Sequence, residues 1–208
     1  IEMSVAEYTR DGGHGSFSYA PMNLKIGLTE RFDLQLLIEP HIRTADDSGS
    51  YRGAGAIGVR AKFNVWGNDG GSTALAIMPF VVLPTGDHDV SPSEIEFGLI
   101  VPLAIELSER VGLGLMIEVD GVADGGGDHE LLLVHPAVLG FDVTDAVGVF
   151  VEYVGQAGSG LFSEYAASAS MGGTLAIGPD VQLDVGVSAG LTDEAEDFGV
   201  FAGVSLRF

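Results

Sequence analysis

The chain has 208 residues, of which 46% are apolar, and it contains no cysteine. Thirty acidic against nine basic residues give a formal net charge of −21, which argues against nucleic-acid binding because DNA and RNA would be repelled. No stretch approaches the ~18 uninterrupted apolar residues of a membrane helix, and 31 glycines with eight prolines favour short strands over long helices.

Apolar residues recur at every second position along most of the chain, which is the period of a β-strand. This alternation predicts twelve strands. In chain order they span approximately 1–10, 19–29, 32–44, 54–66, 73–84, 94–107, 110–121, 129–142, 146–156, 162–176, 180–191 and 197–208. No linker interrupts the pattern, so residues 1–208 are expected to form one domain.

The predicted connections alternate in length and charge. After even-numbered strands they are tight, reading TER, GNDGGS, SER, TDA and GPD. After odd-numbered strands they are mostly longer and acidic, reading DGGHGSFS, ADDSGSYRG, GDHDVSPSE, ADGGGDHE and TDEAED, with the short GQAGSG as the exception. An antiparallel meander gathers the two kinds at opposite ends, which is typical of an outer-membrane barrel.

The two faces of each strand differ in the way that such a barrel requires. In the third strand, Phe32, Leu34 and Leu36 share one face, whereas Asp33 and Gln35 lie on the other. A soluble sandwich would also alternate, but here charged residues sit in the middle of strands among glycines and serines, which suits a hydrated lumen. The sequence therefore predicts an all-β fold, a single antiparallel up-and-down transmembrane β-barrel of 12 strands.

Aromatic residues cluster near the two ends of the apolar faces. Those at the tight-turn end are Phe32, Phe63, Trp66, Phe141 and Phe208, and those towards the long loops are Phe80, Phe97, Tyr153, Tyr165 and Phe198. Two such girdles around an aliphatic band are typical of the two interfaces of a bilayer, so the apolar face is expected to contact lipid.

The residues predicted to line the pore come from the opposite face. By strand parity, the inward basic residues are Lys25, Arg43, Arg60 and Lys62, and the inward acidic residues are Glu96, Glu106, Glu118, Glu152, Glu164 and Asp184. In a twelve-stranded ring the third strand faces the ninth, so a basic wall would face an acidic one. Such a field would orient polar or charged solutes in a narrow pore, with a preference for cations. Alternatively, the opposing charges pair and close the lumen.

Several shorter motifs favour structural interpretations. His14-Gly15-Ser16 resembles the His-x-Ser of a twelve-stranded membrane phospholipase, but it falls in a predicted loop with only Asn23 as a nearby amide, so no enzyme is expected. His135-Pro136 interrupts the alternation and indicates a bulge or kink.

Two acidic stretches, 124–128 and 193–197, are interpreted as solvated loops. Divalent cations that bridge them to lipopolysaccharide phosphates are the alternative. The histidines show no metal-ligand spacing, and neither a metal nor a cofactor is expected.

The stretches FVVLPTGD, GLTERFDLQL, FVEYVG and VQLDVGVSAGLTD with DFGVFAGVSLRF resemble a bacterial outer-membrane family, the transporter-like family linked to the meta pathway of phenol degradation. The resemblance spans nearly the whole chain. It implies an outer-membrane β-barrel that passes small molecules, and it carries over no catalytic or binding residues. The terminal Phe208 also resembles the carboxy-terminal signal that the barrel-assembly machinery recognises.

The sequence thus predicts a passive, narrow outer-membrane channel for small polar or cationic solutes. The alternative is a structural barrel with a closed lumen that anchors or contacts an envelope partner protein. The expected partners are outer-membrane lipid, lipopolysaccharide and, through the C-terminal strand, the assembly machinery. The chain opens on IEMSV without a leader, so the location in the bacterial outer membrane is inferred from the barrel pattern alone.

Overall fold

The computed structural model describes residues 1–46, 49–67 and 69–208. These residues form fifteen strands and one 3-10 turn, η1 (Gly160–Phe162). The strands are β1 (Glu2–Asp11), β2 (His14–Tyr19), β3 (Met22–Thr29), β4 (Phe32–Ile38), β5 (His41–Asp46), β6 (Gly49–Gly53), β7 (Ile57–Trp66), β8 (Thr73–Leu83), β9 (Glu96–Ser108), β10 (Val111–Ala123), β11 (His129–Asp142), β12 (Val147–Gly158), β13 (Ala166–Ile177), β14 (Val181–Gly190) and β15 (Phe198–Leu206). Among the described residues, no helix is long and apolar enough to cross a membrane.

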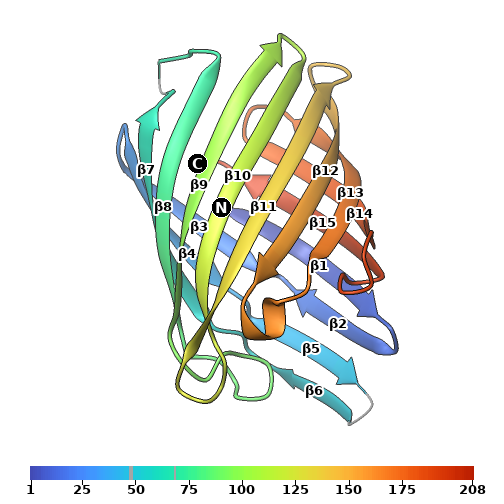
Figure 1. The fold of residues 1–208 in the computed structure, drawn as a ribbon. Helices are drawn as coiled ribbons and strands as arrows, with labels where there is room; N and C mark the ends of the chain where they lie inside the picture. Colours follow the sequence, from blue (N-terminus) through green and yellow to red (C-terminus); the bar gives the residue numbers. More distant parts are fainter. Residues whose placement is uncertain (47–48, 68) are drawn as a thin grey trace.

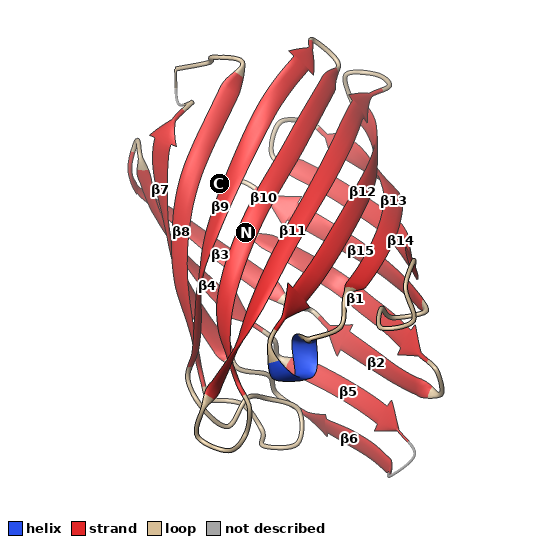
Figure 2. Cartoon of the chain, viewed as in Figure 1, coloured by secondary structure: helices blue, strands red, loops and turns tan. Residues whose placement is uncertain are grey.

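The strands close into a barrel. Every pairing is antiparallel, and the last strand, β15, pairs with β1 from Glu2 opposite Ser205 to Arg10 opposite Phe198 (Figure 1). The elements β2 and β3, β4 and β5, and β6 and β7 are each one long strand with a short interruption, so the barrel has twelve strands, as predicted. The colouring by secondary structure shows that strands make up almost the entire wall (Figure 2).

The barrel is apolar outside and polar inside. Its most buried large side chain is Gln35, which is 2% exposed, whereas Ile26, Ile117 and Val185 are 56–62% exposed. A water-soluble protein buries such aliphatic side chains, so this inversion indicates that the outer surface contacts lipid. A closed barrel has no unpaired strand edge, so the backbone N–H and C=O groups of its strands are hydrogen-bonded even where hydrocarbon surrounds them.

Four neighbouring strands are interrupted at the same level, along what we call the kink line: Val5 in β1, Ala20-Pro21, Glu39-Pro40 and Ala54–Ala56. The β1–β15 register shifts at Val5, and Ala20 has a φ of +55°. Of the three interruptions that separate two strand segments, Ala20-Pro21 and Glu39-Pro40 contain proline, which cannot donate a ladder hydrogen bond. Backbone bonds bridge the line, from Ser4 to Pro21 at 2.9 Å and from Gly55 to Glu39 at 2.8 Å.

Beyond the kink line the strands continue as a lobe formed by residues 6–11 of β1 with β2, β5 and β6 (Figure 1, lower right). The predicted loops at 11–18 and 45–53 are therefore wrong. Both stretches are largely strand, and residues 47–48 lie outside the described residues. Their glycines and serines suggested loops, but Phe17 and Tyr19 alternate with Ser16 and Ser18 along β2.

The remaining connections follow the predicted division. The tight turns gather at one end of the barrel and the longer loops at the other (Figure 1). Asn68, in the predicted GNDGGS turn, is outside the described residues. The loop at 84–95 folds against the kink line, because Asp87 accepts a hydrogen bond from the Ala54 amide at 2.7 Å and Thr85 accepts one from Ile57 at 3.0 Å.

Two local predictions differ from the structure. The tenth strand begins at Ala166 rather than 162, because η1 occupies 160–162. No bulge marks His135-Pro136, since the β10–β11 ladder keeps one register from Leu115 opposite Ala137 to Glu118 opposite Val134. The missing donor of Pro136 is thus accommodated without an extra residue.

Candidate functional site: the barrel lumen

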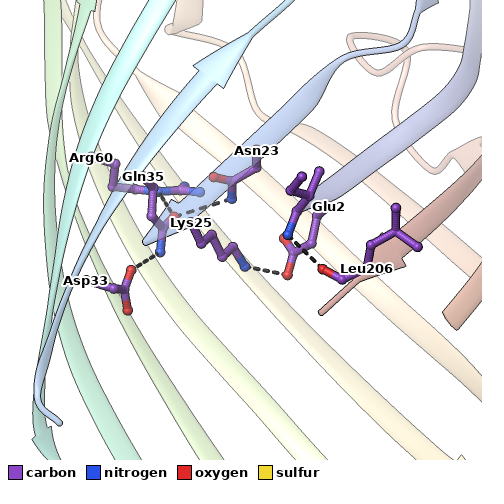
Figure 3. A network of polar contacts seen from close by, with 8 residues as sticks. Glu2, Asn23, Lys25, Asp33, Gln35, Arg60 and Leu206 are labelled. Atoms are coloured by element: carbon purple, nitrogen blue, oxygen red, sulfur yellow. Dashed lines mark hydrogen bonds and ion pairs between the residues drawn. The ribbon is translucent and has the colours of Figure 1, made fainter. Parts of the chain in front are cut away.

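A polar network crosses the inner surface of β3, β4 and β7 (Figure 3). The Gln35 side-chain oxygen accepts hydrogen bonds from Arg60 Nε at 2.9 Å and from Asn23 Nδ2 at 3.3 Å. The Gln35 amide nitrogen donates to Asp33 Oδ1 at 2.6 Å. All four side chains point to the inner face. Asp33 and Gln35 are two positions apart on β4, Arg60 is the register partner of Gln35, and Asn23 is the register partner of Leu37, two positions further along β4.

A second pair extends this network towards the seam between β1 and β15. Lys25 Nζ forms an ion pair with Glu2 Oε1, and the backbone amine of Ile1 donates to Leu206 O at 2.8 Å. The carboxylates of Glu118, Glu2 and Asp33 all lie close enough to act on the charge of Arg60. The basic side chains of this wall are thus surrounded by carboxylates, so the predicted separation into a basic and an acidic wall is incomplete.

Cavities lie on both sides of the network. A cavity of about 640 Å³ towards the loop end is lined by Glu2, Asn23 and Leu37, and also by Glu96 from β9 and Asp184 from β14. A second cavity, of about 720 Å³ at the tight-turn end, is lined by Glu2, Lys25 and Asp33 together with the β13–β14 turn. Asn23 lines the first cavity, Asp33 lines the second and Glu2 borders both, so the network lies between them.

Part of the inner surface is apolar, which the sequence reasoning missed. Ala76, Met78 and Ile100 form a buried cluster against which Phe80 and Met116 pack. Phe80 was predicted to face lipid, and this prediction is wrong. Its register partners are Arg60 and Gly98, and its ring lies over Gly98. The signal was present in TALAIMPFVV, where both faces of β8 are apolar and parity alone could not choose between them.

Two further rings occupy the inside of the opposite wall. Phe150 lies over Gly172 and Phe201 lies over Gly186, and the two rings stack at a centroid distance of 6.5 Å. Glycine at these positions leaves the space that each ring fills. The inner surface therefore contains two apolar regions in addition to the polar network.

The structure places most of the predicted lining residues on the inner face. Strand register gives this position to Lys25, Arg60, Lys62, Glu96, Glu106, Glu118, Glu152 and Asp184. Ser170 Oγ donates to Glu152 at 3.1 Å, and Glu106 helps line a cavity of about 610 Å³ near the tight turns.

Two predicted lining residues lie elsewhere. Arg43 pairs with Phe17 and Arg52 and faces outward, because the strand changes parity at Glu39-Pro40 on the kink line. Glu164 lies in the connection between η1 and β13, not on a strand. Both predictions assumed uninterrupted alternation.

The predicted interface aromatics lie on the outer face or at its ends. At the tight-turn end, the rings of Phe32 and Phe63 lie 4.7 Å apart, and Phe63 and Trp66 are each 47% exposed. Phe141 is exposed on the outer face there, and Phe208 extends beyond β15.

At the loop end, Phe97, Tyr153, Tyr165 and Phe198 share the outer side with His135. Tyr165 Oη hydrogen-bonds to Tyr153 Oη and lies 3.2 Å from His135 Nε2. Phe97 and Phe198 are both more than 40% exposed.

The His14-Gly15-Ser16 motif lies on β2 rather than in the predicted loop. The register sets His14 opposite Asp11 and Ser16 opposite Thr9. Asn23 lies on the other side of the kink line, on β3, and donates to Gln35. The amide considered as the third group is thus committed elsewhere. Among the described residues, no three or more His, Asp or Glu side chains are arranged to hold a metal ion.

Two acidic loops differ in their electrostatics. Backbone amides of Gly126 and Asp128 donate to Asp124 at 2.7 and 3.1 Å, which lowers the pKa of the Asp124 carboxyl. In the β14–β15 loop, a hydrogen bond and charge repulsion from Glu164 raise the pKa of the Glu194 carboxyl. The β12–β13 and β14–β15 loops therefore meet through two carboxyl groups.

We expect this loop contact to weaken as the pH rises. A carboxyl whose pKa is raised in the folded state contributes stability that is complete below its unfolded pKa and is lost as the pH rises through the folded value. The protection of residues 160–166 and 191–197 from hydrogen exchange, relative to the intrinsic rate at each pH, should therefore be greater at pH 4 than at pH 7, and Glu194→Gln should keep it at the higher level at both. The 124–128 loop is the internal control. An equal pH dependence in Glu194→Gln would contradict the carboxyl pairing.

The comparisons with known proteins agree with this geometry. The family model described as "Putative MetA-pathway of phenol degradation" matches residues 2–208. The chain belongs to this family. No curated protein matches it in sequence.

Several solved structures share the fold of this chain at low sequence identity. The NanC porin superposes with a TM-score of 0.71 at 8% identity, covering 100% of this chain and 99% of the porin. The KdgM porin, also solved with disordered oligogalacturonate, gives 0.63 at 10% identity, covering 100% and 99%. The transport unit of the autotransporter AIDA-I from Escherichia coli gives 0.58 at 11% identity, covering 100% and 89%. These likenesses show a shared fold. The location in a bacterial outer membrane follows from the closed barrel and its apolar outer surface.

Proposed function

We propose that this family member is a narrow outer-membrane channel through which small polar or cationic solutes diffuse passively. The observation that carries the proposal is the polar network around Gln35 and Arg60, which lies between two cavities, one lined by its Asn23 and the other by its Asp33. Hydrogen-bonding side chains and charges concentrated at one level of a barrel are the usual elements of a selectivity region. Similarity to porin structures supports the same role.

The charge balance of the lumen favours cations. Three inward basic residues, Lys25, Arg60 and Lys62, lie at or near the network, and Lys25 is already paired with Glu2. Inward carboxylates are more numerous, including Glu96, Glu106, Glu118, Glu152 and Asp184. A negative interior raises the local concentration of cations and lowers that of anions.

We expect single-channel currents in planar bilayers, with a reversal potential in a potassium chloride gradient that corresponds to cation preference. The preference should decline as salt concentration rises, because screening shortens the range of the carboxylate field to about 3 Å at 1 M. Absence of conductance, or anion preference at low salt, would contradict the channel as proposed.

The apolar inner surfaces favour a second candidate, a structural barrel with a closed lumen that contacts an envelope protein. Phe80 with its buried neighbours, and the stacked Phe150 and Phe201, take up space that water would fill in an open pore. Twelve strands lie between the filled eight-stranded barrels and the open sixteen-stranded porins. Zero conductance together with co-purification of a second envelope protein would support this candidate.

We also propose that the barrel-assembly machinery recognises β15. This strand pairs with both β14 and β1 and so completes the barrel. Its outward residues Phe198, Val200, Ala202, Val204 and Leu206 form an uninterrupted apolar row.

A further inference from the structure

The outer surface of the lobe beyond the kink line concentrates positive charge in an acidic protein. Strand register aligns Tyr8, Phe17, Arg43 and Arg52 in one row across β1, β2, β5 and β6. Arg10 lies one outward row further towards the loop end, beside Phe198. These five residues, together with Tyr19 and His41 in the next outward row, form what we call the basic-aromatic patch. All seven side chains are exposed.

The patch faces the outside of the barrel. The neighbouring inward rows contain Glu7, which is opposite Phe201, and Ile42, which is 8% exposed. Because adjacent strand positions point to opposite faces, the residues between them must point outward. The outward row continues into Val200 and Val187, which belong to the lipid-facing surface of β15 and β14.

Three of the chain's nine basic residues lie in this patch. By register, the outward positions of these four strands, as far as they are described, carry no aspartate or glutamate. Arg43 Nε donates to Ser50 Oγ at 3.2 Å, so the Arg43 side chain lies along the outer side of the β5–β6 hairpin. In a chain of net charge −21, three arginines on an outer surface whose described strand positions carry no carboxylate are a specific feature.

The patch also lies at the height of a bilayer interface. Phe32 pairs with Phe63 near the tight turns, and Arg43 pairs with Arg52 eleven residues further along the same two strands. At about 3.3 Å per residue and a tilt of about 45°, this separation corresponds to roughly 26 Å along the membrane normal. The apolar band of an outer-membrane barrel is about 25 Å tall, so the arginines lie just beyond its loop-end edge.

We propose that the basic-aromatic patch binds the phosphate groups of a glycolipid of the outer leaflet. Arginine presents several donors in a planar fork that matches phosphate oxygens, and tyrosine and phenylalanine suit the level between acyl chains and headgroups. Arg43 and Arg52 would contact the phosphate directly, while Phe17 and Tyr8 pack against the acyl chains below it. The proposal rests on the outer-membrane location and not on the channel function. A barrel that does not conduct could still bind the lipid, and a conducting barrel could fail to bind it.

Native mass spectrometry of the detergent-purified full chain with bisphosphorylated lipid A tests this proposal. We expect saturable binding to the unaltered protein and about tenfold weaker binding to the Arg43→Gln/Arg52→Gln variant, because two charge-assisted contacts are lost. The Arg43→Lys/Arg52→Lys variant should keep part of the affinity. Retention of the heat-dependent gel shift of folded barrels shows that each variant is folded.

Matched controls distinguish binding at the patch from nonspecific electrostatic attraction of lipid A to other arginines of the protein. Arg31→Gln/Arg207→Gln removes the same charge at the tight-turn end, where this leaflet is absent, and should bind lipid A unchanged. Dephosphorylated lipid A should bind about tenfold more weakly to the unaltered protein. Binding should persist in a chelator, since arginines and not metal bridges hold the phosphate. Equal loss in both double variants, equal binding of phosphatidylglycerol, or loss of binding on chelation would each overturn the proposal.

Discussion

Arg60→Ala is expected to raise the permeability ratio of potassium to chloride at least threefold. The substitution removes the positive charge that lies among Glu118, Glu2 and Asp33, so the electrostatic potential at the network between the two cavities becomes more negative. It also removes the longest side chain from the network around Gln35, and single-channel conductance should rise as well. Reversal potentials in planar bilayers at low salt measure the first effect.

Arg43→Ala is the matched control. Uninterrupted parity predicts that Arg43 lines the pore as Arg60 does, whereas the strand register places it on the outside. Its removal should leave the reversal potential unchanged. Equal shifts in both variants would contradict the parity change at the kink line, and no shift in either would contradict a conducting lumen next to Arg60.

Gly172→Val is expected to destabilise the barrel by about 3 kcal/mol, within the range for overpacked positions. A Cβ atom at Gly172 would lie 2.4 Å from the Phe150 ring and 2.4 Å from the backbone oxygen of Val185. The ring could turn away, but the Val185 oxygen belongs to the neighbouring strand and cannot move without breaking the ladder. Urea unfolding in lipid vesicles, followed by the fluorescence of Trp66, measures the change.

Gly112→Val provides the comparison. A Cβ atom at Gly112 has no neighbour within 4 Å, although this residue is also an inward-facing strand glycine, near the tight-turn end of β10. The substitution should be neutral or slightly stabilising, because valine suits a strand better than glycine. Equal destabilisation by both variants would show that the loss comes from a general need for inner-face glycines and not from the Phe150 contact.

Local patterns predict this fold well because one physical rule acts on most strands. Lipid outside and water or polar side chains inside impose strict alternation, so the faces of β4, β9, β10 and β14 could be read directly from the sequence. Closure by β15 and β1 follows from the same rule, because no strand edge can remain in hydrocarbon.

The errors arise where alternation stops being informative. In β8 both faces are apolar, so parity could not show that Phe80 faces inward. At the kink line, a change of parity reverses the orientation of Arg43 although its flanking residues look regular. The network around Gln35 could not be predicted either, since it depends on which polar residues of three strands share one level, and this is set by register rather than by any single strand.

The seam between β1 and β15 has a consequence for the order of folding. Ile1 and Leu206 are 205 residues apart in the chain, whereas most other strand pairs join neighbours across a turn or short loop. Because the entropy of loop closure grows with the logarithm of loop length, closing the seam costs roughly 3 kcal/mol more than closing a ten-residue hairpin. Hairpins along the meander can therefore form one after another as an open, curved sheet. Completion of the ring is then a single late event with a high contact order, and its rate should limit how fast the protein matures.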